Sequence, residues 1–411
     1  MELNIKQRIK ENVLAGMNLS GEINDEDVMA VIDRCILAEF RDLYIPLRER
    51  ISLRNEIFNS IRKMDILSDF LEDDEITEIM INGPENIFYE KAGQLYKSEK
   101  TFESTERLMT VIQQIVGEAN RMVNESNPIV DSILNDGSRV NIVLKGVSVD
   151  GSAVTIRKFP KETMNMERLI ALDSLDEKVA GFLGMLVASG YNIFISGGTG
   201  AGKTTFLSAL TQYIPEGERV VTIEDSAELK VNGVKNLVRL EARNANVEGK
   251  NMITIRDLIK CSLRMRPSRI IVGEVRDAAA IDMLQAMNTG HDGSLSTGHA
   301  NSGHEMLMRL EAMVLMGADL PLKAVRQQIA SAIDIVVHLG RLRDRSRRVL
   351  EIREVIGMEN EEIVTRELFR FVETGSDKSR VYGELQKIND LMNVGKLMSA
   401  GYFEVYREKY V

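Results

Sequence analysis

The sequence predicts an α/β protein built on a doubly wound parallel sheet, preceded by a smaller α+β domain and an N-terminal helical segment. A short apolar run, Ile193–Ile195, leads into a glycine-rich turn and a helix-competent segment. From residue 174 to 337, short hydrophobic runs alternate with helical patterns, which is typical of a parallel sheet covered by helices. Residues 66–159 contain strands and one amphipathic helix without that rhythm, which favours a small α+β domain.

The composition indicates a soluble protein of two or three domains. Its 411 residues are too many for one compact core. The net charge of −10 argues against a surface devoted to DNA or RNA, and no run approaches the ~20 apolar residues that a membrane span needs. Cys35 and Cys261 lie far apart in helical patterns, so we expect a reducing cytoplasm and neither a zinc site nor a disulfide framework.

We expect five segments along the chain. Residues 1–65 show helical spacing and form an N-terminal extension, and residues 66–159 form the α+β domain. Residues 160–172 are expected to be a linker that acts as a hinge. Residues 173–340 hold the parallel sheet, and residues 341–411 add a strand pair and helices. The first segment could be a docking arm for a partner or a packed helical extension, and its spacing favours the second.

The elements of the two domains follow from periodicity and turn residues. In the α+β domain we expect, in order, a strand at 76–84, a hairpin of 87–90 with 95–97, a helix around 108–116, a turn at 135–137, and strands at 140–144 and 154–158. In the main domain we expect a helix opened by a capping box at Ser174–Glu177, strands at 193–195, 219–224, 269–274 and 333–337, helices capped by Thr254 and Asp277, and a strand pair around 350–356.

The glycine-rich turn carries the complete pattern of a phosphate-binding loop, Gly197-x-x-x-x-Gly202-Lys203-Thr204. Its glycines let backbone N–H groups curl round a polyphosphate, and the following helix adds its positive end. Lys203 supplies a cation for the β- and γ-phosphate oxygens, and the Thr204 hydroxyl can ligate Mg²⁺. The sequence therefore predicts ATP and Mg²⁺ as cofactors, bound by Gly197, Gly198, Thr199, Gly200, Ala201, Gly202, Lys203, Thr204 and Thr205.

Acidic residues end two of the predicted strands. Glu274 follows a hydrophobic run, where an acid can reach the Mg²⁺ or its waters beside the loop. Glu224 and Asp225 end another strand and would open into the same crevice, where a carboxylate can orient the attacking water. Either acid could instead be a helix cap.

Histidines and arginines supply further candidates. Gly290–Asn301 places His291 and His299 within nine residues. We expect this small, polar stretch to build no core and to act as a conformational sensor near the γ-phosphate, because a metal site would lack a third ligand. The arginines that could meet developing negative charge are Arg139 and Arg157 in the α+β domain, and Arg264, Arg266 and Arg276 near the third strand. Each could instead be solvated or salt-bridged.

Residues 341–348 hold five arginines. Such a cluster is similar to a nucleic-acid-binding patch. The interleaved Asp344 and Ser346, and the lack of aromatic residues, favour an exposed turn instead.

Four ordered motifs resemble the type II/type IV secretion ATPase superfamily, and they lie at residues 197–205, 222–229, 264–276 and 297–299. Residues 135–141, 155–159, 347–352 and 367–371 look like the Tad/Flp-pilus assembly branch of that superfamily. The match covers about residues 66–375. The four-cysteine zinc element of some type II export ATPases is missing, which moves the chain away from that branch.

The resemblance implies a homohexamer with nucleotide bound between a PAS-like N-terminal domain and a RecA-like core. Matched by position, Lys203 and Thr204 belong to the Walker A loop, and Glu274 is the Walker B acid that reaches Mg²⁺. Glu224 belongs to the acidic box, which is usually assigned the activation of water. His291 and His299 form the histidine box, and Arg139 and Arg157 match arginines that sit near nucleotide.

The resulting hypothesis is a cytoplasmic ATP hydrolase that powers pilus assembly or protein secretion. It would dock on inner-membrane platform proteins and so associate peripherally with the membrane. One alternative is a RecA-like nucleic-acid translocase; the acidic charge and the absence of aromatic–basic stripes count against it, and we expect no nucleic acid as a partner. A second alternative is a nucleotide-sensing scaffold that binds without turnover.

Overall fold

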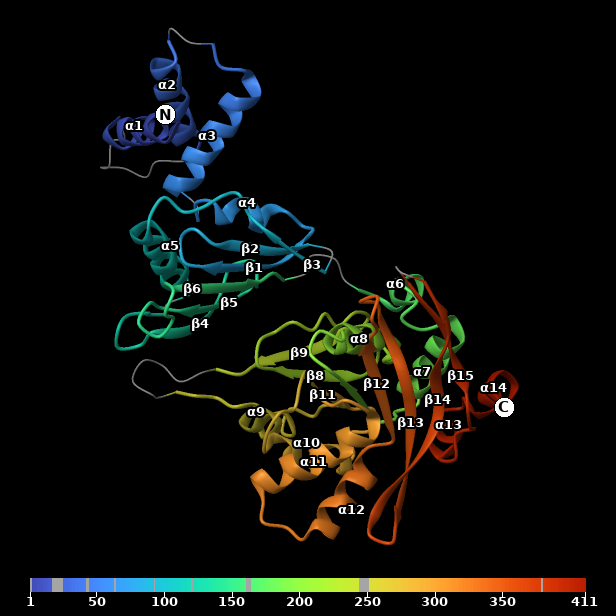
Figure 1. Ribbon diagram of the computed structural model, residues 1–411. Helices are drawn as coiled ribbons and strands as arrows, with labels where there is room; N and C mark the ends of the chain where they lie inside the picture. The colour runs from blue at the N-terminus through green and yellow to red at the C-terminus, as the bar shows by residue number, and fades with distance from the viewer. Residues whose placement is uncertain are drawn as a thin grey trace. The chain divides into compact units, whose positions relative to one another are not determined.

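The computed structural model describes residues 2–16, 25–41, 44–62, 64–91, 93–119, 121–159, 164–243, 251–377 and 380–411. Contacts gather the chain into two compact units, residues 1–161 and 162–411 (Figure 1). Among the described residues, no helix has both the length and the apolar character needed to cross a bilayer.

The first unit begins with three helices, α1 (Glu2–Gly16), α2 (Asp25–Glu39) and α3 (Leu47–Arg62). Each contributes one apolar side to a shared core, as expected for amphipathic helices. That core consists of Ile9, Val13, Val28, Ile32, Ile36, Ile57 and Phe58. The described part of the N-terminal segment therefore forms packed helices.

A six-stranded antiparallel sheet follows in the first unit, with the strand order β3-β2-β1-β6-β5-β4. Its elements are α4 (Leu67–Glu72), β1 (Ile76–Asn82), β2 (Ile87–Lys91), β3 (Gln94–Lys97), α5 (Thr105–Glu118), β4 (Ile129–Ile133), β5 (Arg139–Val143) and β6 (Ala153–Arg157). Alternate residues of the central strands, such as Ile79, Ile156 and Val140, pack with the apolar side of α5. The strands, hairpin and helix expected from the sequence are present, and β4 completes the hairpin around residues 135–137.

The second unit is a nine-stranded sheet with the order β15-β14-β13-β12-β7-β11-β10-β8-β9. Strands β12, β7, β11, β10, β8 and β9 are parallel neighbours, and β13 to β15 extend the sheet antiparallel. The bounds of the strands are β7 (Ile193–Gly197), β8 (Arg219–Glu224), β9 (Asn236–Glu241), β10 (Arg269–Val272), β11 (Leu295–Gly298), β12 (Ile335–Arg341), β13 (Arg347–Glu359), β14 (Glu362–Ser376) and β15 (Val381–Lys387).

Helices cover both faces of this sheet (Figure 1). One face packs against α6 (Met166–Ala171), α7 (Glu177–Ala188), α8 (Lys203–Leu210), the 3₁₀ turn η1 (Thr211–Tyr213), α13 (Gly395–Ser399) and α14 (Phe403–Tyr410). The other packs against α9 (Ile255–Ser262), α10 (Ala279–Asn288), α11 (Gly303–Gly317) and α12 (Leu322–Ala332). In β7, Ile193 and Ile195 enter the first core, and Phe194 enters the second. The predicted α/β fold with a parallel sheet is thus confirmed.

The stretch Gly290–Asn301 corrects one expectation, because it does build core. Its residues Leu295–Gly298 form β11, a buried strand between β7 and β10. The hydroxyl groups of Ser296 and Thr297 donate hydrogen bonds to the carbonyl oxygens of Val272 and Gly273, at 2.9 and 2.7 Å. Small side chains whose polar atoms are satisfied by a neighbouring strand can be buried without apolar periodicity.

Two further expectations at the start and end of the second unit are corrected. Residues 160–163 of the predicted linker lie outside the described residues, but α6 lies within it and buries Met166 and Leu169 against the second unit. The C-terminal strand pair is instead three strands, β13 to β15, which continue the main sheet.

The first helix of the second unit also begins differently from expectation. The N-cap of α7 is Asp176, whose Oδ1 accepts the N–H of Val179 at 2.7 Å. The Ser174 hydroxyl donates to the Arg347 carbonyl oxygen instead. Ser174 therefore ties α7 to β13 rather than capping the helix.

Candidate nucleotide site

The phosphate-loop motif forms a tight turn between β7 and α8. Gly200 and Gly202 have φ angles of +73° and +91°, a backbone conformation that glycine adopts without a Cβ penalty. At Gly197 a Cβ would lie 2.6 Å from the carbonyl oxygen of Leu339, the residue that faces it across β12. The glycines are thus required by backbone conformation and close packing, and Gly198, Thr199 and Gly200 remain exposed.

The side chain of Lys203 lies along the loop rather than in solvent. The residue is only 7% exposed. Its Nζ atom donates to the Gly198 carbonyl oxygen at 3.1 Å and lies 3.2 Å from Nδ1 of His299. His299 follows the end of β11, so a strand that the sequence did not reveal brings it to the loop.

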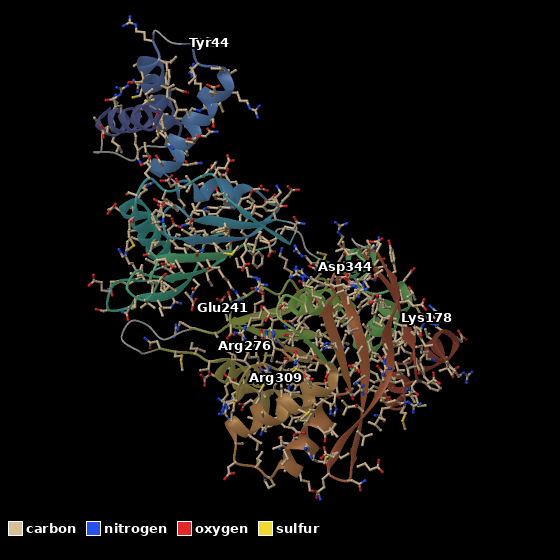
Figure 2. The ribbon with its side chains drawn as sticks, in the orientation of Figure 1. Tyr44, Lys178, Glu241, Arg276, Arg309 and Asp344 are labelled. Atoms are coloured by element: carbon tan, nitrogen blue, oxygen red, sulfur yellow. The ribbon has the colours of Figure 1, made fainter. Side chains whose placement is uncertain are left out.

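A chain of polar contacts continues from His299 across the carboxyl ends of the neighbouring strands. His299 Nε2 lies 2.9 Å from Oε1 of Glu274, just beyond β10. Arg276 donates to Oε2 of Glu274 at 2.8 Å and lies 3.8 Å from the carboxylate of Asp225, after β8 (Figure 2). Because these strands are parallel, their carboxyl ends meet at one edge of the sheet, and five predicted residues come together there.

Charge states within this chain follow from burial and from the neighbours. Burial raises the pKa of Glu274, but the hydrogen bond and charge of Arg276, with His299 and Lys203, outweigh it and leave the pKa lowered. Burial and the charge of Lys203 lower the pKa of His299 against the opposing effect of Glu274. A neutral His299 fits the contact with Lys203, since Nδ1 can then accept from the ammonium group, whereas the approach of Nε2 to Glu274 Oε1 is a close polar contact without hydrogen-bond geometry.

Glu224, at the end of β8, has a different environment. It is 4% exposed, and burial raises its pKa to about 7 although hydrogen bonds from the N–H groups of Leu229 and Glu228 oppose the rise. Both of these bonds go to Oε1, at 2.8 and 3.0 Å. The other oxygen, Oε2, is buried and has no hydrogen-bond partner among the described residues. These hydrogen bonds therefore hold the segment 225–229 over the Glu224 carboxyl in this conformation.

Arg239 is a contributor that the sequence did not single out. It lies on β9, and its Nη2 donates to the carbonyl oxygens of Ala227 and Leu229, each at 3.2 Å. Its positive charge also lowers the pKa of Glu224. Arg239 thus fixes the same segment that Glu224 holds. Only knowledge of the β8–β9 pairing reveals this role.

The chain is similar in sequence to proteins of a known family. Residues 62–405 match the family model described as "Type II/IV secretion system protein". The chain belongs to this family. A "Putative conjugal transfer protein" of Mycobacterium tuberculosis is 35% identical over 293 residues, which are 70% of this chain and 83% of that protein. The "Type IV secretion system protein PtlH" of Bordetella pertussis is 32% identical over 317 residues, or 70% of this chain and 93% of that protein.

The chain is also similar in fold to solved structures. The X-ray structure of the Yersinia pseudotuberculosis ATPase DotB aligns with a TM-score of 0.52 at 17% identity, covering 72% of this chain and 79% of that one. A likeness at this identity concerns the fold alone. The chain therefore shares an α/β ATPase fold with this structure over the aligned part.

Three predicted site residues of this family member do not join the cluster. His291 precedes β11, at the opposite end of the strand from His299, and its Nδ1 lies 3.0 Å from the Ala286 carbonyl oxygen at the end of α10. Arg264 and Arg266 precede β10, whereas Glu274 follows it. Within the second unit these residues lie at the amino edge of the sheet. A role for them at the nucleotide site stays a prediction.

Arg139 and Arg157 belong to the first unit, where the antiparallel register places them side by side. They are direct partners across β5 and β6, and Arg157 is also the partner of Glu78 on β1. Like charges directly opposite each other destabilise a strand pair. Arg157 is exposed and Arg139 is half-buried, so the pair presents positive charge on the sheet face opposite α5.

The buried carboxyl of Glu224 predicts a pH-dependent stability. Between its ordinary pKa of 4.5 and about 7, the carboxyl ionises in the unfolded chain but not in the folded one. Stability contributed by Glu224 is therefore present below pH 4.5 and lost as the pH rises through 7, by about 3 kcal/mol at 1.36 kcal/mol per pH unit. Glu224→Gln keeps a hydrogen-bond acceptor and does not titrate, so wild type should lose this amount relative to the variant.

Denaturant unfolding at a series of pH values from 4.5 to 8 measures the difference. The matched control is Glu241→Gln, which removes an exposed carboxyl from the neighbouring strand (Figure 2). A wild-type-minus-Glu224→Gln difference that stays flat over this range would contradict the assignment.

Proposed function

We propose that this chain is an ATP hydrolase that powers pilus assembly or protein secretion. The observation that carries the proposal is the contact chain from Lys203 through His299 and Glu274 to Arg276. It joins a phosphate loop to the acids of the neighbouring strands. Membership of the type II/IV secretion family supports the biological role. The motifs at 135–141 and 155–159 support the Tad/Flp branch.

The proposed cofactors are ATP and Mg²⁺, and the residues present fit a magnesium nucleotide. Thr204 stands half-buried in the first turn of α8, next to Lys203. Glu274 is kept ionised by Arg276, so it can attract the cation or its waters. When bound, the magnesium nucleotide supplies a phosphoryl group whose developing charge the metal helps to neutralise. Thr204 and Glu274 would hold the metal, the latter partly through water.

Lys203 is the residue whose environment must change on nucleotide binding. In this structure its ammonium group bonds to Gly198 and His299, within the loop. A phosphate is a stronger acceptor than a neutral imidazole, so Lys203 would turn to the β- and γ-oxygens. His299 would then lose the cation beside it while keeping its contact with Glu274. In this way, nucleotide binding at the loop would change the environment of His299 and, through it, that of Glu274.

Glu224 is the proposed activator of water, but only after a local opening. Its carboxyl now accepts N–H groups of 228 and 229 and is buried. Movement of the segment 225–229 would expose it, and exposure would lower its pKa by removing the burial that raises it. A base whose pKa falls when its covering segment moves would couple hydrolysis to conformation.

Arg139 and Arg157 are proposed to complete the nucleotide site from a movable domain. The two arginines are direct partners across β5 and β6, so the strand register holds their positive charges side by side. If Arg139 and Arg157 reached the phosphates, they would stabilise the negative charge that develops in the transition state. The proposed assembly is a homohexamer, in which these arginines act across an interdomain or subunit gap. It would be cytoplasmic and held on the inner membrane by platform proteins.

Lys203→Ala should abolish hydrolysis and weaken nucleotide binding, because the cation over the β- and γ-phosphates is lost. Lys178→Ala is the matched control, since Lys178 is an exposed lysine on α7 (Figure 2). Phosphate release and nucleotide titration of both purified variants give the answer, with and without the membrane platform protein. Turnover by Lys203→Ala within a few-fold of wild type would show that the loop around Lys203 is not the site of hydrolysis.

Mixing variants tests whether the arginines act between subunits. An Arg139→Ala, Arg157→Ala protein should stay folded, since the exposed Arg157 contributes little to stability and the half-buried Arg139 lies on the sheet face away from the domain core, but it should lose ~10³-fold in turnover. Mixed with Lys203→Ala, it should regain part of the activity, because some interfaces then pair an intact loop with intact arginines. Absence of recovery in assemblies shown to have exchanged subunits would rule out action between subunits.

A further inference from the structure

Arg347 lies beside the phosphate loop, although it is 144 positions away from Lys203 in the sequence. A Cβ built on Gly202 would lie 3.4 Å from Cδ of Arg347. The sheet explains this approach. Strand β12 pairs with β7 until Leu339 faces Gly197, then runs on to Arg341, whose partner on β13 is Arg347. The start of β13 therefore lies next to the loop.

The backbone at Arg347 is firmly held. Its carbonyl oxygen accepts the Ser174 hydroxyl at 2.9 Å. The turn before it is closed by a hydrogen bond from the Leu342 N–H to the Ser346 carbonyl oxygen, also at 2.9 Å. Asp344 accepts both the N–H and the hydroxyl of Ser346, at the end of the β12–β13 hairpin (Figure 2). The backbone that carries the Arg347 side chain therefore has a defined position before any ligand arrives.

Two neighbouring arginines have structural partners on the far side of the hairpin. Arg343 forms an ion pair with Glu373 on β14. Arg348 is buried, and its guanidinium donates to the carbonyl oxygens of Asp173 and Val381. Arg347 is exposed, as Arg343 is, but its side chain lies against the loop glycine Gly202. Of the three, it alone is positioned to meet a ligand on the phosphate loop.

The strand order decides which end of the ligand it would meet. His299, Glu274 and Asp225 follow β11, β10 and β8, which all lie on one side of β7, whereas β12 and β13 lie on the other. A nucleotide whose γ-phosphate meets Lys203 and His299 therefore has its nucleoside end toward β12. We propose that Arg347 binds the nucleotide at its α-phosphate, an inference that rests on the proposed function.

This position separates the effect of Arg347 on binding from any effect on chemistry. A cation at the α-phosphate contacts ATP and ADP alike, so it contributes uniform binding rather than stabilisation of the transition state. The guanidinium reaches an oxyanion with a charge-assisted hydrogen bond, and losing one such bond lowers affinity by about 10-fold. KM should rise by a similar factor while kcat stays within about twofold of wild type.

Calorimetric titration of the full chain tests the proposal. The ligands are MgADP and the magnesium complex of a slowly hydrolysed ATP analogue. Arg347→Ala should weaken both by about 10-fold, and Arg347→Lys should recover part of the loss. The matched control Arg343→Ala removes the same charge from the same hairpin and should bind as wild type does. If Arg347→Ala fails to fold, Arg347→Gln, which keeps the stem, carries the test.

Three results would overturn the inference alone. One is an unchanged affinity of Arg347→Ala for MgADP, which leaves the proposed function standing because wild type still binds. The second is a loss confined to the ATP analogue, which would place Arg347 at the γ-phosphate. The third is an equal loss of affinity in Arg343→Ala, which would show that the effect comes from net charge alone. Failure of wild type itself to bind either nucleotide would refute the proposed function, and this inference with it.

Discussion

The contact between Lys203 and His299 links the two halves of the site. On one side stands a loop whose glycines allow the backbone to turn between β7 and α8. On the other stand Glu274 and Arg276, reached through His299 Nε2. The link exists because β11 is inserted between β7 and β10, so that its carboxyl end opens beside the loop. Strand β11 thus places His299 between Lys203 and Glu274.

Electrostatics give the two glutamates different states at this edge. Glu274 is held ionised by a guanidinium and two further cationic or polar neighbours, whereas Glu224 is raised to a pKa of about 7 by burial. The Glu274 carboxyl is therefore ionised, as the proposed metal site requires, and the Glu224 carboxyl is covered by the segment 225–229. In the proposed mechanism, this difference would separate nucleotide binding from hydrolysis.

Local patterns predicted the loop and the strand-end acid Glu274, because a phosphate loop and a buried parallel strand each have a sequence signature. They did not predict β11, whose serine and threonine hydroxyls are satisfied by a neighbouring strand. His291 and His299 look alike in sequence, yet β11 separates them by its full length. The pairing of Arg139 with Arg157 depends on strand register, which no single stretch of sequence encodes.

The most direct test of the account is a structure of the full chain with magnesium and a slowly hydrolysed ATP analogue. The account predicts nucleotide on residues 197–205, with Lys203 Nζ bonded to phosphate oxygens instead of His299, and His299 still in contact with Glu274. A nucleotide bound away from this loop, or one bound there while Lys203 keeps its contact with His299, would contradict the central claim.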